Sequence, residues 1–120
     1  MTQWIADFYS VVDQLDLEAL RAATSADIKV TFANNPTSEG FDQLAGNLSM
    51  LWGAVDSMSH TPVRLWEIPG TDWGAFEAVI TYVRKDGAVI TIPNVSSLHR
   101  DADGKIDELH AYVDLTPLFS

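Results

Sequence analysis

The sequence contains no cysteine and few basic residues, and each shortage excludes a class of chemistry. Without cysteine the chain has no disulfide, no thiolate nucleophile and no zinc–thiolate site. Only 7 Lys and Arg residues stand against 17 Asp and Glu residues, which gives a formal net charge of -10 at pH 7. This negative field repels phosphate backbones and anionic lipid headgroups, so nucleic acids and membrane surfaces are not expected partners.

Long apolar runs are also absent. No segment approaches the roughly 18 consecutive apolar residues that a membrane-spanning helix needs. Residues 1–7 lack the basic start and apolar run of a secretory signal, so we expect a cytoplasmic protein. Apolar residues nevertheless make up 47% of the 120 residues, which is enough for a folded core. No repeat or linker divides the sequence, and this predicts one domain over residues 1–120.

The N-terminal part of the chain has the periodicity of helices. A helix is predicted from about Thr2 to Leu15, and Asp16 is suited to cap a second helix over 17–24. One strand with alternating apolar and polar residues is expected over 28–32. A third helix is predicted over 40–57, where apolar residues recur every three or four positions: Phe41, Leu44, Leu48, Leu51, Trp52 and Val55.

Beyond Ser59 the apolar period changes to two, which is typical of strands. Four strands are predicted, over 61–68, 73–84, 88–100 and 105–113. Pro93 cannot donate a backbone hydrogen bond, so we expect a bulge or a sheet edge there. Helices first and strands afterwards predict an α+β fold, in which about three helices pack on one face of a curved, mostly antiparallel sheet. Long strands that curl around the helices would leave a conical cavity.

Several segments resemble one known family. The stretches 8–13, 16–20 and 26–32 resemble the opening of nuclear transport factor 2-like domains. The stretches that resemble the middle hairpin and the tail of the SnoaL-like branch are 82–87, 103–106, 111–114 and 117–119. The resemblance implies a cone-shaped fold, commonly a homodimer, with a pocket between the helices and the concave sheet. Known members include polyketide cyclases, limonene-epoxide hydrolases, ketosteroid isomerases and dehydratases, while others only bind or assemble, so the resemblance assigns no single function.

The catalytic positions of two branches of this family do not carry the residues that their chemistry needs. In the epoxide hydrolase branch, the resemblance places these positions at Val79, Thr81 and Ala111. In the ketosteroid isomerase branch, it places them near Ala33 or Asn34, at Phe8 beside Tyr9, and at Ser96. The carboxylates that would activate water or remove a proton are missing at these positions. The sequence therefore predicts neither reaction with the residues that those branches use.

Polar residues on two predicted strands are candidates for ligand contacts. If Val79 points inward, strand alternation places Glu77 and Thr81 inward too, and on the next strand Asn94 and Ser96 share one face. Thr81, Asn94 and Ser96 could then hold a ligand carbonyl or hydroxyl group. The alternative is that they are ordinary strand residues, satisfied by water or backbone. Tyr9 and Trp52 are further candidates to contact the ligand. The alternative for Trp52 is a place in the hydrophobic core.

Two titratable residues are candidates for acid–base catalysis. His60 falls between the third helix and the following strand, and a histidine that titrates near neutral pH suits a general base. The alternative for His60 is a helix-end residue in solvent. Glu77 is the only carboxylate that alternation places inside, and its alternative is a strand-edge position in water. His99 and His110 are expected to face away from the cavity, while Asp7 and Asp13 are expected to be solvated charges on the polar side of the first helix.

Two function hypotheses stay open. No histidines have the close spacing of metal ligands, so no metal site is predicted, and no cofactor is expected. The first hypothesis is an acid–base enzyme of isomerase, cyclase or dehydratase type, in which His60 or Glu77 moves a proton on an apolar carbonyl or cyclic substrate. The second is a non-catalytic ligand-binding or dimerisation module. The expected partners are a small apolar ligand and, from the resemblance, a second copy of the chain.

Overall fold

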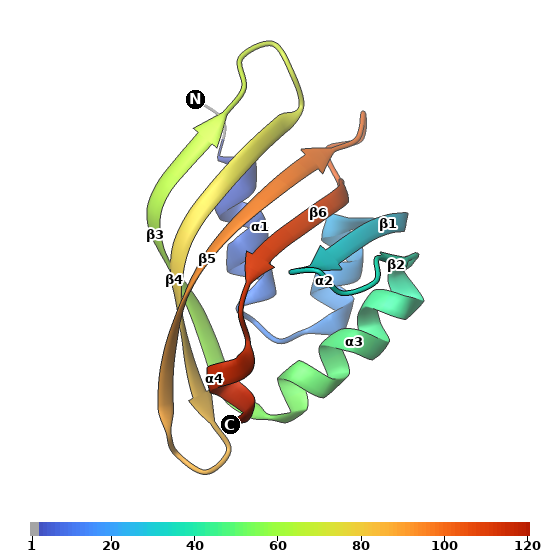
Figure 1. The fold of residues 1–120 in the computed structure, drawn as a ribbon. Helices are drawn as coiled ribbons and strands as arrows, with labels where there is room; N and C mark the ends of the chain where they lie inside the picture. Colours follow the sequence, from blue (N-terminus) through green and yellow to red (C-terminus); the bar gives the residue numbers. More distant parts are fainter. Residues whose placement is uncertain (1–2) are drawn as a thin grey trace.

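The computed structural model describes residues 3–120 and shows helices packed on one face of a curved sheet (Figure 1). The helices are α1 (Trp4–Val12), α2 (Leu17–Ala23), α3 (Phe41–Gly53) and a short α4 (Thr116–Phe119). The strands are β1 (Thr24–Phe32), β2 (Ser38–Glu39), β3 (Val55–Glu67), β4 (Trp73–Arg84), β5 (Val89–Arg100) and β6 (Ile106–Val113). The predicted α+β fold, with about three helices on a curved and mostly antiparallel sheet, is confirmed.

The six strands follow the order β2-β1-β6-β5-β4-β3. Strands β3 to β6 form the predicted antiparallel meander. β1 pairs with the free edge of β6 in parallel orientation, with Val30 opposite Leu109. The core fills the space between the helices and the concave face of the sheet. Within residues 3–120 no helix is both long and apolar enough to cross a membrane.

The first two helices follow the predicted pattern closely. The side chain of Asp16 caps α2 as predicted, because its Oδ1 accepts the backbone N–H groups of Glu18 and Ala19 at 3.0 and 3.3 Å. α1 ends at Val12, before the predicted Leu15, since Leu15 takes a left-handed φ of 54° that cannot continue a helix. The predicted start of this helix at Thr2 lies outside the described residues.

The boundary between α3 and β3 corrects the predicted helix over 40–57. α3 ends at Gly53 and β3 begins at Val55. Val55 and Met58 are both buried and three residues apart, which is helical spacing. In the structure a register shift between Val55 and Ser57 inserts an extra residue, so a bulged strand buries both side chains. β1 begins at Thr24, four residues before the predicted start at residue 28. Its pairing with β6 has a register shift between Thr24 and Lys29, which interrupts the alternation expected of a strand.

Pro93 lies inside β5 without a bulge. It faces Val79 of β4, and the register between these two strands has no shift. β6 pairs with β5 only from Asn94 onward, so Pro93 has a strand on one side only. Proline lacks the backbone N–H that would donate to a neighbouring strand. It fits here because no strand pairs with it on the side toward β6. The prediction of a sheet edge is correct for this stretch, and the prediction of a bulge is wrong.

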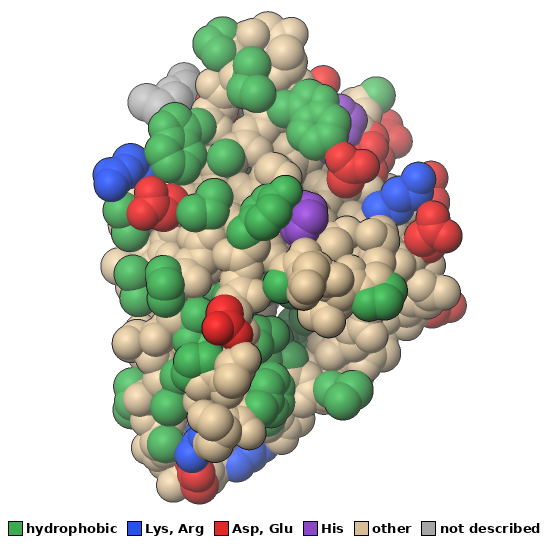
Figure 2. Space-filling view, viewed as in Figure 1, with side chains coloured by type: hydrophobic (Ala, Val, Ile, Leu, Met, Phe, Trp, Pro, Cys, Tyr) green, Lys and Arg blue, Asp and Glu red, His purple; other side chains and the backbone are tan. Residues whose placement is uncertain are grey.

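The outer face of the sheet carries several exposed apolar side chains. Figure 2, viewed from the same side as Figure 1, shows hydrophobic side chains spread over this part of the molecule. They include Trp66, Trp73, Val79, Val95 and Tyr112, and each of these is at least a third exposed. At the end of the chain Leu118 is buried in the core while Phe119 is exposed, so the last turn packs through one residue only.

Candidate functional site

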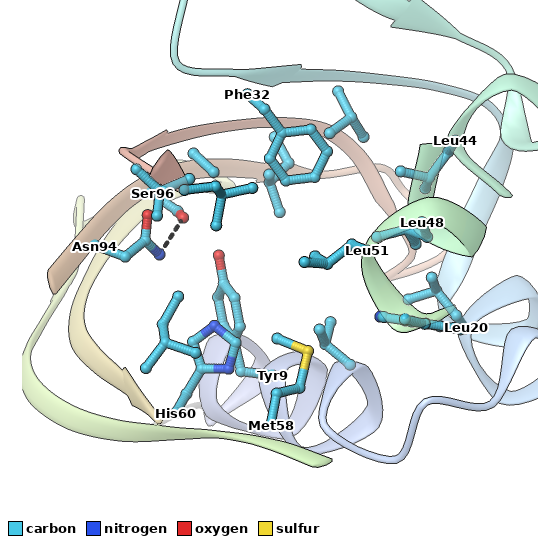
Figure 3. A pocket seen from close by; sticks show the side chains of 18 of the residues that line it. Tyr9, Leu20, Phe32, Leu44, Leu48, Leu51, Met58, His60, Asn94 and Ser96 are labelled. Carbon is cyan, nitrogen blue, oxygen red and sulfur yellow. Dashed lines mark hydrogen bonds between the residues drawn. The ribbon is translucent and has the colours of Figure 1, made fainter. Parts of the chain in front are cut away.

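A cavity lies between the helices and the concave face of the sheet (Figure 3). Its walls come from α1, α2, α3 and five of the strands, and most of its lining side chains are aliphatic or aromatic. The volume of the cavity is about 70 Å³. One water needs about 10–15 Å³ of such a volume, so the cavity has room for several waters or for one small ring.

His60 lines this cavity and is held in place by Asp13. The Nδ1 atom of His60 lies 2.6 Å from Asp13 Oδ1, and the backbone N–H of His60 donates to Asp13 Oδ2 at 2.8 Å. The side chain of His60 is 4% exposed and that of Asp13 is 21% exposed. A carboxylate can only accept hydrogen bonds, so Nδ1 carries a hydrogen and the neutral ring keeps its lone pair on Nε2. The pair therefore has the arrangement of a base oriented by a carboxylate.

Asp13 is the functional candidate that the sequence interpretation missed. It was expected to be a solvated charge on α1, and that expectation is wrong. Asp13 lies at the C-terminal cap of α1, and His60 lies 47 residues further along the chain. One signal was present in the sequence: Asp13 follows Tyr9 by four residues, so a helix places both on the same side.

The ring of Tyr9 packs beside His60. The centroids of these two rings are 4.5 Å apart, and the ring of Tyr9 also stacks on that of Phe76 at 4.7 Å. The hydroxyl group points toward Asn94 and Ser96 (Figure 3), but it is buried and has no hydrogen-bond partner within residues 3–120. Burial raises the pKa of the Tyr9 hydroxyl; the nearby Ser96 hydroxyl opposes this, and the charge of Asp13 adds to it. Tyr9 is therefore a neutral O–H donor.

Asn94 and Ser96 form the polar part of the wall. Both residues are buried and line the cavity from β5, as the alternation of that strand predicts. Asn94 Nδ2 donates to Ser96 Oγ at 3.0 Å, while Asn94 Oδ1 is buried without a partner in the described part of the chain. The two strand residues and the hydroxyl of Tyr9 thus form one small polar group in an apolar cavity.

Glu77 and Thr81 lie on the opposite, outer face of β4, so the prediction that they point inward is wrong. The buried side of β4 consists of Gly74, Phe76, Ala78, Ile80 and Tyr82. Glu77 Oε1 instead lies 3.4 Å from Arg64 Nε on the outer face. Apolar residues occupy both faces of this strand, and the prediction began from Val79, which is 36% exposed. Alternation alone therefore could not identify which face is buried.

Trp52 and two histidines complete the set of predicted residues. Trp52 lines the cavity from the last turn of α3, and its Nε1 is buried without a partner among residues 3–120. His99 and His110 face away from the cavity, as predicted. His99 Nδ1 lies 2.6 Å from Asp107 Oδ1, and His110 Nε2 lies 2.9 Å from the carbonyl oxygen of Ala33. No cluster of metal-ligating side chains occurs within the described residues.

Comparisons with known proteins agree with this architecture. The family model of the SnoaL-like domain matches residues 5–109. The structure is similar to that of an NTF2-like protein of unknown function from an Exiguobacterium species, with 21% identity, a TM-score of 0.77, and coverage of 95% of this chain and 100% of that chain. A search of curated proteins finds no match.

Two further solved structures share the fold at lower identity. One is a proposed polyketide cyclase from Xanthomonas campestris pv. campestris, with 17% identity, a TM-score of 0.82, and coverage of 95% of this chain and 90% of that chain. The other is a protein with a ketosteroid isomerase-like fold from Catenulispora acidiphila in complex with trimethylamine, with 17% identity, a TM-score of 0.81, and coverage of 98% and 90%. At these identities the similarity shows the fold alone.

Proposed function

The chain belongs to the SnoaL-like domain family, and we propose that residues 1–120 form one domain that binds a small, mostly apolar ligand and moves a proton on it. The observation that carries this proposal is the imidazole of His60, which Asp13 fixes at the wall of an otherwise apolar cavity. A base held by a carboxylate and shielded from water suits proton abstraction next to a carbonyl group.

In this proposal each polar residue of the cavity has a separate task. His60 Nε2 takes a proton from the carbon next to the ligand carbonyl, and Asp13 stabilises the imidazolium that forms. The buried indole N–H of Trp52 donates to the oxygen on which negative charge develops, and the hydroxyl group of Tyr9 binds a polar group at the other end of the ligand. His60 then returns the proton to another carbon or to a leaving hydroxyl group, which gives an isomerisation or a dehydration. These steps use only side chains of the chain and need no cofactor.

The other candidate residues lie either in the wall of the cavity or on the outer face of the sheet. Asn94, Ser96 and Trp52 are proposed to contact the ligand, because their polar atoms are buried in the cavity wall. Glu77 and Thr81 have no proposed role in the cavity, because they lie on the outer face of β4.

A proton-exchange experiment tests the catalytic proposal without knowledge of the natural substrate. Cyclohexanone is incubated with the protein in D₂O, and loss of its α-protons is followed by ¹H NMR. We expect the wild-type protein to accelerate exchange, and His60→Gln to lower the enzymatic rate by about 100-fold. His99→Gln is the matched control, because His99 makes the same 2.6 Å contact with a carboxylate on the outer face.

The same experiment separates catalysis from binding alone. A His60→Gln rate equal to that of the wild type would show that His60 is not the base. Binding of cyclohexanone without any acceleration of exchange would favour the second candidate function, a non-catalytic binding module. The family positions occupied by Val79, Thr81 and Ala111 favour that alternative, because none of them supplies a carboxylate.

We also propose a homodimer that forms through the outer face of the sheet, in a cytoplasmic location. The exposed Trp66, Trp73 and Tyr112 support this proposal, since large apolar patches on a protein surface commonly mark interaction sites (Figure 2). Light scattering is expected to give the mass of a dimer, and Trp73→Glu to give that of a monomer. A monomeric wild-type protein at micromolar concentration would contradict the proposal.

A further inference from the structure

Three buried polar atoms around the cavity lack a hydrogen-bond partner within residues 3–120. They are Tyr9 Oη, Asn94 Oδ1 and Trp52 Nε1. Buried polar groups in folded proteins are nearly always bonded, so each exception needs an explanation. The one other such side-chain atom in this part of the chain, Ser25 Oγ, does not line the cavity. The grouping of the first three around one empty space indicates that a bound molecule satisfies them.

The chemistry of the three atoms specifies what that molecule must supply. The indole Nε1 of Trp52 can only donate, so it needs an acceptor. The amide of Asn94 already donates through Nδ2 to Ser96, so its Oδ1 is a free acceptor and needs a donor. The hydroxyl of Tyr9 can donate one hydrogen bond and accept another. The bound molecule therefore needs at least one donor and at least one acceptor.

The positions of the three protein atoms indicate where the donor and the acceptors lie on the ligand. Tyr9 Oη points toward Asn94 and Ser96 (Figure 3), so a single ligand hydroxyl can accept from Tyr9 and donate to Asn94. Figure 3 also shows Leu48 and Leu51 of α3 on the other side of the cavity from Asn94 and Ser96. Trp52 follows on the same helix and lines the cavity. A second acceptor is therefore needed toward α3.

Charge limits the ligand further. The cavity lining contains no Lys or Arg, and the carboxylate of Asp13 contacts the lining residue His60. The whole chain carries a formal net charge of -10. A carboxylate or phosphate group would enter this space without a cation to balance it, and its loss of hydration would be uncompensated. An anionic ligand is therefore excluded.

We infer that the cavity takes a small neutral ring that bears a hydroxyl group at the end of Tyr9 and Asn94 and a carbonyl oxygen toward Trp52. This inference rests on the proposed function for the location of the ligand, but it does not require turnover. It narrows the ligand from any small apolar molecule to the class of cyclic hydroxyketones.

Binding measurements with three simple rings test the inference. The probes are 4-hydroxycyclohexanone, cyclohexanol and cyclohexanone, and binding is followed by ¹⁹F NMR of protein that carries 5-fluorotryptophan. We expect the hydroxyketone to bind about tenfold more tightly than either ring with one oxygen, because each oxygen adds a hydrogen bond to a buried group. Equal affinity of all three rings, within about threefold, would overturn the inference.

Variants assign the two ends of the ring. Trp52→Phe removes the indole N–H and should reduce the affinity of the hydroxyketone to that of cyclohexanol, while Trp66→Phe on the outer face should leave it unchanged. Asn94→Leu should reduce it to that of cyclohexanone. Because Asn94→Leu also removes the contact with Ser96, Tyr9→Phe provides a second variant that deletes one hydroxyl group only. Unchanged selectivity in Trp52→Phe and Tyr9→Phe would overturn the inference.

The outcomes separate this inference from the proposed catalytic function. Preference for the hydroxyketone without proton exchange would support the ligand class and contradict catalysis. Proton exchange on cyclohexanone without preference for the hydroxyketone would support catalysis and contradict the ligand class. Tighter binding of cyclohexanecarboxylate than of the neutral rings would overturn the inference, and failure of every ring to bind would overturn both.

Discussion

Asp13 holds His60 at two points, one on the ring and one on the backbone. One carboxylate oxygen lies 2.6 Å from Nδ1 of the ring, and the other accepts the backbone N–H of His60 at 2.8 Å. The first contact sets the tautomer of the imidazole, and the second fixes where β3 passes the end of α1. The same carboxylate therefore serves both the chemistry of the cavity and the packing of its walls.

Replacement of Asp13 by Asn is expected to affect both roles. The variant loses the charge that favours the imidazolium, so proton exchange on cyclohexanone should slow by about tenfold or more. The free energy of unfolding should fall by about 1–3 kcal/mol, because two partly buried hydrogen bonds are weakened. Exchange is measured by NMR and stability by urea unfolding.

Asp107→Asn, in the matching pair on the outer face, should leave proton exchange unchanged. Equal effects of the two variants would contradict a special role for Asp13.

The glycine at position 74 is expected to tolerate no side chain. A Cβ atom there would lie 2.5 Å from Ile5 Cδ1 and 2.7 Å from the backbone oxygen of Trp66. The oxygen belongs to the neighbouring strand and cannot move alone, so Gly74→Ala should lower the free energy of unfolding by about 1–3 kcal/mol. Gly46→Ala is the control: its Cβ meets nothing within 4 Å on an exposed face of α3, and it should stabilise the protein by about 0.5–1 kcal/mol. Opposite signs in thermal unfolding confirm the prediction, and equal signs contradict it.

Two buried tyrosines are expected to make the protein sensitive to high pH. Burial raises the pKa of Tyr9 and of Tyr82, and the charge of Asp13 adds to both shifts. Because the folded-state pKa lies above that of the unfolded chain, the associated stability is complete below pH about 10 and is lost as the pH rises further. Tyr9→Phe and Tyr82→Phe should each reduce this loss in urea unfolding between pH 8 and 11. The exposed Tyr112→Phe serves as control, and an equal effect there would refute the assignment.

Arg84 is expected to hold the last turn of the chain beside the cavity. Its Nη1 donates to the carbonyl oxygens of Leu118 and Ser120 at 3.2 and 3.1 Å, while Nε and Nη2 bind both oxygens of Asp86. Leu115, which precedes α4, lines the cavity. Arg84→Met should therefore speed hydrogen exchange at the amide of Leu118 and the release of cyclohexanone. Arg64→Met, which removes the contact with Glu77 on the outer face, should change neither rate. Similar rates in both variants would rule out the role of Arg84.

Local sequence patterns specify the buried face of some strands and not of others. The inward face of β5 was predictable, since Asn94 and Ser96 alternate in phase with Leu98, which is fully buried. On β4 the same reasoning failed, because Val79 outside and Ile80 inside are equally apolar and only the packed helices decide between them. A local pattern therefore identifies a buried face only where the opposite face is polar.

The pairing of Asp13 with His60 was beyond the reach of local patterns. The two residues are 47 positions apart, and their contact depends on where β3 crosses the end of α1. The bulge at the start of β3 was concealed for a related reason: Val55 and Met58 have helical spacing in the sequence. Both features of the site arise from tertiary geometry, so only the folded chain reveals them.

The parallel pairing of β1 with β6 has a consequence for the order in which the sheet is assembled. During synthesis, β1 emerges early, but the strand that covers most of its length begins only at Ile106. Until then it has only the two residues of β2 as a neighbour, and the apolar Ile28 and Val30 have no sheet to join. Contacts between distant segments form slowly. We therefore expect β1 to be among the first strands made and the last to enter the sheet, and to be the segment that a nascent-chain chaperone protects.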